Sequence, residues 1–181
     1  MDLSYMESVI WAFKELYKKG LIYKGYKVMP YSWACQTPLS NFETKMDNAY
    51  RERQDPAVTV AFELTPKADD ALPLRVLAWT TTPWTLPSNF GLAVNKAITY
   101  VIVSDQGQGY LLAESIYEKS KDLFQAPELV GTILGADLIG RKYTPLFPYF
   151  AATAGAFEIF HADFVTTEEG TGVVHLAPYG E

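Results

Sequence analysis

A run of hydroxyl side chains is the first feature of this sequence that suggests chemistry. The segment WTTTPWTLPSN, residues 79–89, holds four threonines, two tryptophans and two prolines. Threonine hydroxyls are poor nucleophiles without a base, but they exchange hydrogen bonds and can hold an ester or a water molecule in place. On composition alone, the simpler interpretation is a surface loop whose tryptophan packs in the core. The candidate residues are Thr80, Thr81, Thr82 and Thr85.

Other reactive groups are few. The two histidines, His161 and His175, have no nucleophile motif such as G-x-S-x-G nearby, and Cys35, the single cysteine, lies in the unremarkable context SWACQTP. The sequence contains no HExxH, no Cys-x-x-Cys, no carboxylate-rich loop and no glycine-rich phosphate loop. We therefore expect neither a metal nor a cofactor. Composition alone favours a satisfied core histidine for His175.

The elements that must position these residues are mostly short strands. Proline lacks an N–H, so Pro83 and Pro87 should end a strand near Thr80 or Thr81 and leave a constrained loop. Three- and four-residue spacing of apolar side chains predicts an amphipathic helix over residues 4–20, with Gly20 as its stop. Its apolar residues Ile10, Phe13 and Tyr17 should be buried against the rest of the domain.

Alternation and apolar runs predict the remaining elements. Strand candidates are residues 58–64, 74–80, 99–105, 132–140, 155–165 and 170–178, and residues 109–124 begin as a strand and continue as a helix. Many short strands with two or three helices predict an α+β fold, with a closed or nearly closed β-barrel core of about six or more strands and flanking helices.

Bulk composition limits the function classes. The chain has 181 residues, 49% of them hydrophobic and 20% charged, as in an ordinary globular domain. A net charge of −6 argues against a broad grip on nucleic acid, although a local contact to a single-stranded end stays open. No apolar run is long enough to span a membrane, and one cysteine fits a reducing, cytoplasmic setting.

Two motifs together resemble a known family. WTTTPWTLPSN at 79–89 and GTGVVHLAP at 170–178, about ninety residues apart, resemble the two signatures of the editing (CP1) domain inserted in isoleucyl-tRNA synthetases and shared with the valyl and leucyl enzymes. The opening residues 1–32 resemble the lead-in from the synthetase catalytic core, so the resemblance covers nearly the whole chain. It implies one editing domain over 1–181, with residues 1–30 as lead-in helix and linker and 31–181 as barrel core.

The resemblance also points to a subtype. The TTTPWT form is similar to isoleucyl and valyl types, whereas the leucyl type has Arg and Asp in the region of Pro83 and Trp84. A histidine after GTGVV is similar to the isoleucyl form, since the valyl form has lysine there. The implied activity is hydrolysis of mischarged Val-tRNA(Ile), and of valyl-adenylate as a second route. One methylene supports only about 1–3 kcal/mol of discrimination, a magnitude for which the isoleucyl enzyme is the standard illustration, so a second sieve is needed.

The resemblance assigns roles to particular residues. The four threonines would hold the aminoacyl ester, its ribose and the attacking water, and Trp84 and Asn89 would contact substrate. The resemblance puts His175 at the bottom of the amino-acid pocket, where its bulk would exclude the larger isoleucine. The local sequence, with a glycine turn before His175 and a strand end after it, predicts instead a side chain at a rim. The competing hypothesis makes His175 the general base, a role that an ordinary histidine pKa near 6.5 would suit. The family's ammonium-binding aspartate would fall about nine residues after His175, beyond the sequence, and Glu181 is the candidate to replace it.

The implied partners are the 3′-terminal aminoacyl-adenosine of tRNA(Ile), its valine moiety and the catalytic core of the parent synthetase. Two alternatives stay open: a valyl-type domain that removes threonine, and a non-catalytic module that binds aminoacyl-adenosine.

Overall fold

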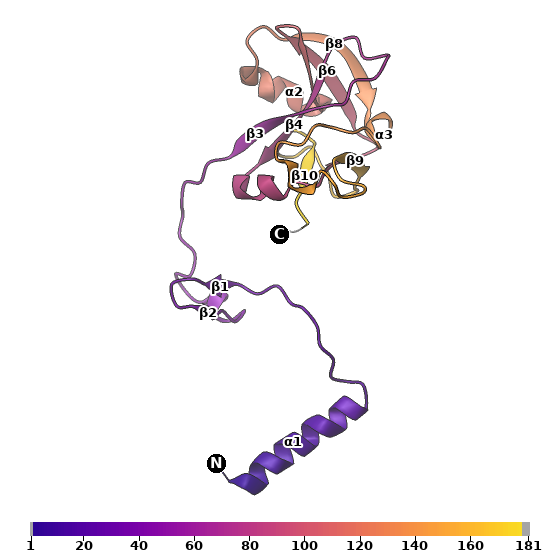
Figure 1. The fold of residues 1–181 in the computed structure, drawn as a ribbon. Helices are drawn as coiled ribbons and strands as arrows, with labels where there is room; N and C mark the ends of the chain where they lie inside the picture. The colour runs from indigo at the N-terminus through magenta and orange to yellow at the C-terminus, as the bar shows by residue number, and fades with distance from the viewer. Residues whose placement is uncertain (1, 179–181) are drawn as a thin grey trace. The chain divides into compact units, whose positions relative to one another are not determined.

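The computed structural model describes residues 2–178. The chain divides into two compact units, Met1–Arg53 and Gln54–Glu181, which we describe separately (Figure 1). This division falls after Arg53, whereas the sequence led us to expect a core that begins at residue 31.

The first unit is built around one helix, α1 (Leu3–Lys18). The helix ends as predicted: Gly20 has a φ of 70°, and its N–H donates to the Tyr17 carbonyl. The other elements of this unit are short, namely β1 (Tyr31–Ser32), β2 (Thr37–Pro38) and the 3₁₀ turn η1 (Glu43–Lys45).

Taken by itself, the first unit does not bury its helix. Helix α1 buries no residue there, and Phe13 is 57% exposed, with Ile10 and Tyr17 each at 64%. The predicted packing of this face against the rest of the domain stays a prediction. The apolar spacing that produced the prediction is real, but spacing identifies only the face that can be buried and not what covers it.

The second unit contains a five-stranded sheet of order β3-β4-β7-β6-β8 (Figure 1). Its strands are β3 (Val58–Glu63), β4 (Leu74–Thr80), β6 (Thr99–Asp105), β7 (Gln108–Ala113) and β8 (Glu128–Leu134). All neighbours are antiparallel except β4 and β7. Strands β3, β4 and β6 match the predicted ranges closely, because each alternates or forms a clean apolar run.

A three-stranded sheet of order β10-β5-β9 completes the β structure. Its strands are β5 (Gly91–Val94), β9 (Glu158–His161) and β10 (Val174–Leu176). The helical pieces of this unit are α2 (Glu114–Tyr117), α3 (Gly135–Leu138) and the 3₁₀ turns η2 (Pro83–Ser88), η3 (Glu118–Leu123) and η4 (Pro148–Phe150).

The α+β class and the several-stranded core are confirmed, but a closed barrel is not found in the part of the chain that the structure describes. Strands β3 and β8 are the two edges of the larger sheet, and each pairs with a single neighbour. Sequence alternation shows that a strand is half-buried, but it does not show whether the two edges of a sheet meet.

The core lies on both faces of the larger sheet. On one face, Tyr100, Phe62 and Leu111 belong to a cluster that also includes residues of β5 and β9. On the other face, Val101 and Val103 pack with the residues around α2. Because buried apolar side chains cover both faces of this sheet, the end of β4 is held on a rigid support.

Candidate functional site

The threonine segment begins where β4 ends. Strand β4 finishes at Thr80, and η2 starts at Pro83, the first position of the turn. The predicted strand end near Thr80 or Thr81 is therefore confirmed. Proline suits the first turn of a helix because no partner is needed for its missing N–H.

Three of the four threonines form a connected set of hydroxyls. The Thr80 and Thr82 Oγ1 atoms lie 3.3 Å apart, and those of Thr82 and Thr85 lie 3.4 Å apart. The Thr85 hydroxyl donates to the Thr82 carbonyl oxygen at 2.7 Å, and the Thr82 N–H donates to Thr80 Oγ1 at 3.1 Å. These hydrogen bonds fix the backbone of the loop and also link the three threonine side chains to one another.

Thr81 differs from these three. Its side chain is exposed, and its hydroxyl has no hydrogen-bond partner among the described residues. It lines a pocket of about 220 Å³ together with Thr80 and His175. Among the four threonines, Thr81 is therefore the one whose hydroxyl is available to a ligand.

His175 joins the threonine set from a different part of the chain. It lies on β10, paired opposite Leu92 of β5, and its Nε2 is 2.9 Å from Thr85 Oγ1. The imidazole is only 6% exposed, so the predicted rim position is wrong. Side chains alternate along β10, so Val174 is exposed and His175 points inward. The proline after the strand indicated where the strand ends, but not which of its side chains is buried.

A tight glycine turn positions β10. Gly170 and Gly172 have φ values of 74° and 75°, which favour glycine. A Cβ at Gly172 would lie 2.5 Å from the Ala113 Cβ, so a larger residue does not fit. Between them, Thr171 donates its hydroxyl to the Leu77 carbonyl at 2.6 Å, and the Tyr100 hydroxyl donates to the Gly172 carbonyl at 2.7 Å. Burial raises the pKa of Tyr100 to about 12, so this hydroxyl stays protonated at neutral pH.

The rest of the pocket wall comes from residues that we did not predict. Trp79 and Thr166 line it, and Glu169 is the carboxylate among its described lining residues. Glu169 directly precedes the glycine turn of the second motif. Its position beside that turn is the signal that could have identified it.

Two predicted substrate contacts, Trp84 and Asn89, do not line this pocket. Trp84 is 66% exposed and does not line this pocket. Asn89 is 4% exposed: its Oδ1 accepts from the Tyr143 hydroxyl at 2.6 Å and its Nδ2 donates to the Gly91 carbonyl at 3.0 Å. In this structure Asn89 is a support for η2 and β5 and not part of the pocket. Glu181 lies outside the described residues.

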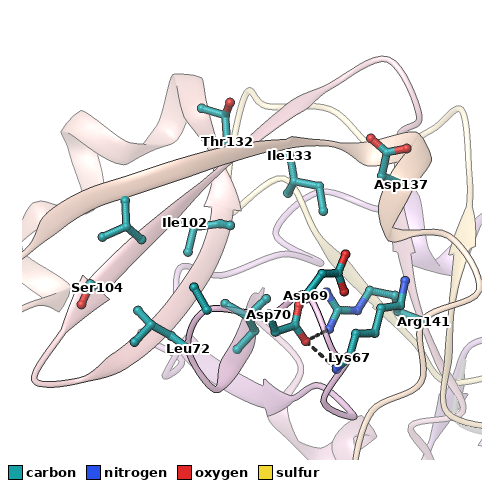
Figure 2. Close-up of a pocket in the computed structure, with 13 residues that line it drawn as sticks. Lys67, Asp69, Asp70, Leu72, Ile102, Ser104, Thr132, Ile133, Asp137 and Arg141 are labelled. Carbon is teal, nitrogen blue, oxygen red and sulfur yellow. Dashed lines mark hydrogen bonds and ion pairs between the residues drawn. The ribbon is translucent and has the colours of Figure 1, made fainter.

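A larger cavity of about 830 Å³ lies on the β6 and β8 side of the sheet (Figure 2). Its Arg141 is 4% exposed and donates two hydrogen bonds to Asp70, at 3.1 and 2.6 Å. Burial raises the pKa of the Asp70 carboxyl, but hydrogen bonds from Arg141 and the Lys67 N–H outweigh it and hold the pKa below its ordinary value. The two charges satisfy each other, and this ion pair joins the loop after β3 to the segment after α3.

Among the described residues, no group of three or more His, Cys, Asp or Glu side chains could hold a metal ion. A search of the described helices finds none that is both long and apolar enough to cross a membrane.

Sequence comparisons find close relatives across the whole chain. Residues 1–169 match the model for tRNA synthetases class I (I, L, M and V). The isoleucine–tRNA ligase of Rickettsia felis is 51% identical over 199 residues, covering 100% of this chain and 18% of the relative. The isoleucine–tRNA ligase of Mycobacterium tuberculosis is 51% identical over 186 residues, again covering 100% of this chain and 18% of the relative. The chain thus spans about a fifth of the length of the curated relatives it matches.

The fold is similar to that of a solved editing domain. The crystal structure of the leucyl-tRNA synthetase CP1 domain GlLeuRS-CP1 matches with a TM-score of 0.58 and 16% identity, over 68% of this chain and 55% of that one. At this identity the match supports the fold alone.

Proposed function

The chain belongs to the class I tRNA synthetase family of isoleucyl, leucyl, methionyl and valyl enzymes and has a CP1 editing-domain fold, and from this premise we propose that it hydrolyses valine from mischarged Val-tRNA(Ile). Valyl-adenylate is a second substrate under this proposal. The implied partners are the 3′-terminal aminoacyl-adenosine, the rest of a synthetase, and a cytoplasmic pool of tRNA.

One observation carries the proposal: Thr81 is exposed and lines a small pocket that Thr80 and His175 also line. Thr80, Thr82 and Thr85 exchange hydrogen bonds among themselves. An available hydroxyl on a rigid loop can hold a water molecule or an ester oxygen in a reactive position, and such positioning accounts for a large share of enzymatic rate enhancement. No covalent intermediate is required.

The size of the pocket supports valine as the hydrolysed residue. A volume of about 220 Å³ suits a small aminoacyl group. Thr85 and His175 are both buried beside it. Close-packed side chains move little, so the extra methylene of an isoleucyl group would be accommodated poorly. A second site that admits the smaller product and excludes the larger one supplies the discrimination that a single binding step lacks.

The α-ammonium group of the substrate needs a negative partner, because charge-assisted hydrogen bonds are the strong ones. Glu181 stays a prediction for this role. Glu169 is the carboxylate that the described part of the pocket provides.

The test is deacylation of valyl-tRNA(Ile) by the purified chain and by Thr81→Ala. We expect the substitution to lower the rate roughly 10- to 100-fold, the usual loss when a positioning or stabilising donor is removed. Thr81→Ser should restore most of the rate, and Thr132→Ala, an exposed threonine at the larger cavity, is the matched control. A Thr81→Ala rate equal to that of the parent would refute the role of this hydroxyl.

A further inference from the structure

We propose that the cavity of about 830 Å³ on the β6 and β8 side of the larger sheet is a second binding site, which takes a free α-amino acid with an apolar side chain. In the described part of the chain, this cavity shares no lining residue with the threonine pocket. Its occupation therefore does not depend on the proposed hydrolysis. Three features indicate this ligand: an apolar floor, a space left open by a glycine, and charges of both signs at one end.

The floor of the cavity is aliphatic. Leu74 is 6% exposed, and Leu72, Ile102 and Ile133 are half-buried. Ile102 and Ile133 also pack against the buried core, which holds them in place. An apolar group that covers these side chains removes them from water, so the floor favours a ligand with an aliphatic or aromatic body. Cavities of about 300–1,000 Å³ with such a lining and a few polar groups are typical of small-molecule sites.

A glycine leaves part of this floor uncovered. Gly131 of β8 pairs with Ile102 of β6. A Cβ at Gly131 would meet the end of the Ile102 side chain at 3.7 Å, an ordinary contact, and apart from its chain neighbours no other described residue comes within 4 Å. Gly131 does not have a positive φ, so the backbone there does not require glycine. The space over Ile102 is therefore open because β8 carries no side chain at this position.

Charges of both signs lie at one end of the cavity. Figure 2 shows Lys67, Asp69 and Asp137 toward the end where Arg141 lies and away from Ser104. The charged atoms of these three exposed side chains make no hydrogen bond or ion pair with the described residues. An ammonium group is attracted by the two carboxylates and a carboxylate by the lysine, more strongly in a partly enclosed site than in open water. The two charged groups of an α-amino acid are attached to one carbon, so one small ligand meets both kinds of partner.

The ion pair beside these groups is incompletely satisfied. Arg141 donates from both terminal nitrogens to Asp70, but its Nε is buried and has no hydrogen-bond partner among the described residues. A buried donor without a partner is unfavourable, so negative charge near the guanidinium stabilises it. Asp70 also accepts the Lys67 N–H at 2.8 Å, which holds the loop that carries Lys67 and Asp69. The fixed positive charge at this end favours a zwitterion over a simple amine.

The test is a titration of the full chain with leucine and three related compounds, followed by the NMR spectrum of the backbone amides. Isopentylamine lacks the carboxylate of leucine, isocaproate lacks its ammonium group, and glycine lacks its apolar body. We expect leucine to shift the amides of Ile102, Ile133 and Asp137 saturably. Isopentylamine and isocaproate should each bind about fivefold more weakly, the upper end for one exposed ion pair, and glycine should not saturate. The amides of Thr81 and His175 report separately on any binding in the threonine pocket.

Variants separate the cavity from the rest of the surface. Gly131→Leu should fill the space over Ile102 and abolish the saturable shifts. The double variant Asp69→Asn, Asp137→Asn should bind leucine about fivefold more weakly, because the ammonium group loses its partners, and should not weaken the binding of isocaproate. Asp163→Asn, with a side chain that is 92% exposed outside the cavity, is the control and should bind leucine as the parent does.

Equal affinities for leucine and isopentylamine would overturn the assignment of an amino acid. Unchanged binding by Gly131→Leu, shifts confined to the threonine pocket, or no saturable shift with any compound would overturn the site. If Gly131→Leu loses the dispersed spectrum of a folded chain, the double aspartate variant decides, because both of its side chains are exposed. Leucine binding by that variant equal to that of the parent would then overturn the proposal.

Discussion

At the scale of single residues, the site depends on which hydroxyls are already engaged. Thr80, Thr82 and Thr85 exchange hydrogen bonds within the loop, whereas Thr81 is exposed at the pocket. The four similar side chains therefore divide into two groups. Three of them hold the loop, and Thr85 among these also bonds to His175, whereas Thr81 is the one that we propose to meet the ligand.

His175→Ala should enlarge the pocket and extend hydrolysis to correctly charged isoleucyl-tRNA(Ile). The imidazole is buried beside Thr85, so its removal opens space that a methylene can enter. Activity on the valyl ester should persist, because we assign the ring to exclusion and not to proton transfer. Rates on both esters are the measurement. Loss of valyl activity without any gain on the isoleucyl ester would instead support a general base.

At this scale the sequence suggested the members of the candidate site, but not their geometry. The resemblance of the two motifs assigned the threonines and His175 to one site. Composition favoured a buried His175 whereas its local context favoured a rim, and a strand of three residues offers too little alternation to decide between them. Asn89 lies within the threonine motif, yet it bonds to Tyr143, 54 residues away, a contact that no local pattern encodes.

At the scale of elements, strands with clean patterns were predictable, and the boundaries of the less regular segments were not. Strands β4 and β6 have the predicted ranges, whereas the range 132–140 divides into the end of β8 and the short helix α3. Gly135 starts that helix, and a Cβ there would lie 2.1 Å from the Asn95 carbonyl oxygen. Tertiary contact thus decides the boundary, and tertiary contact cannot be derived from periodicity.

The ion pair between Asp70 and Arg141 should make the stability of the second unit depend on acidity. The Asp70 carboxyl has a pKa below its ordinary value of 3.8, so its contribution to the free energy of unfolding is present above about pH 4. That contribution is lost as the pH falls through the lowered pKa of the folded state. Urea unfolding between pH 7 and pH 3 should show the decline in the parent and a smaller decline in Asp70→Asn.

At pH 7, Asp70→Asn should lower the free energy of unfolding by up to about 3–5 kcal/mol, because it leaves the buried Arg141 without a counter-charge. Glu63→Gln is the matched control. Its partner Arg75 is 4.0 Å away and both side chains are well exposed, so the change should be within about 0.5 kcal/mol. Equal losses in the two variants would contradict the assigned importance of the buried pair.

Within its own unit, helix α1 should gain little stability from Phe13. Phe13 is 57% exposed, so Phe13→Ala should change the free energy of unfolding by less than about 0.5 kcal/mol. Phe62→Ala, at a fully buried position, should cost about 3–5 kcal/mol. Urea denaturation followed by tryptophan fluorescence compares the two variants. A loss of several kcal/mol in Phe13→Ala would mean that the helix is buried after all.

At the scale of the whole molecule, the described residues of the candidate site belong to one unit. The buried apolar side chains that the structure describes begin at Phe62, and the threonine set, the glycine turn and the pocket all lie in Gln54–Glu181. The sequence predicted the α+β class because many short strands leave few alternatives. It did not predict that the strands of the second unit divide into two sheets, since pairing between distant strands has no local signature.

The central claim is that this chain removes valine from tRNA(Ile) and leaves isoleucine in place. The most direct measurement is the deacylation rate of valyl-, threonyl- and isoleucyl-tRNA(Ile) by the purified chain, with the Thr81→Ala variant assayed in parallel. We predict rapid hydrolysis of the valyl ester, slower hydrolysis of the threonyl ester, no hydrolysis of the isoleucyl ester, and a loss of the valyl activity in the variant. Preference for the threonyl ester would instead indicate a valyl-type domain, and binding of all three esters without hydrolysis would indicate a recognition module; either result would contradict the account.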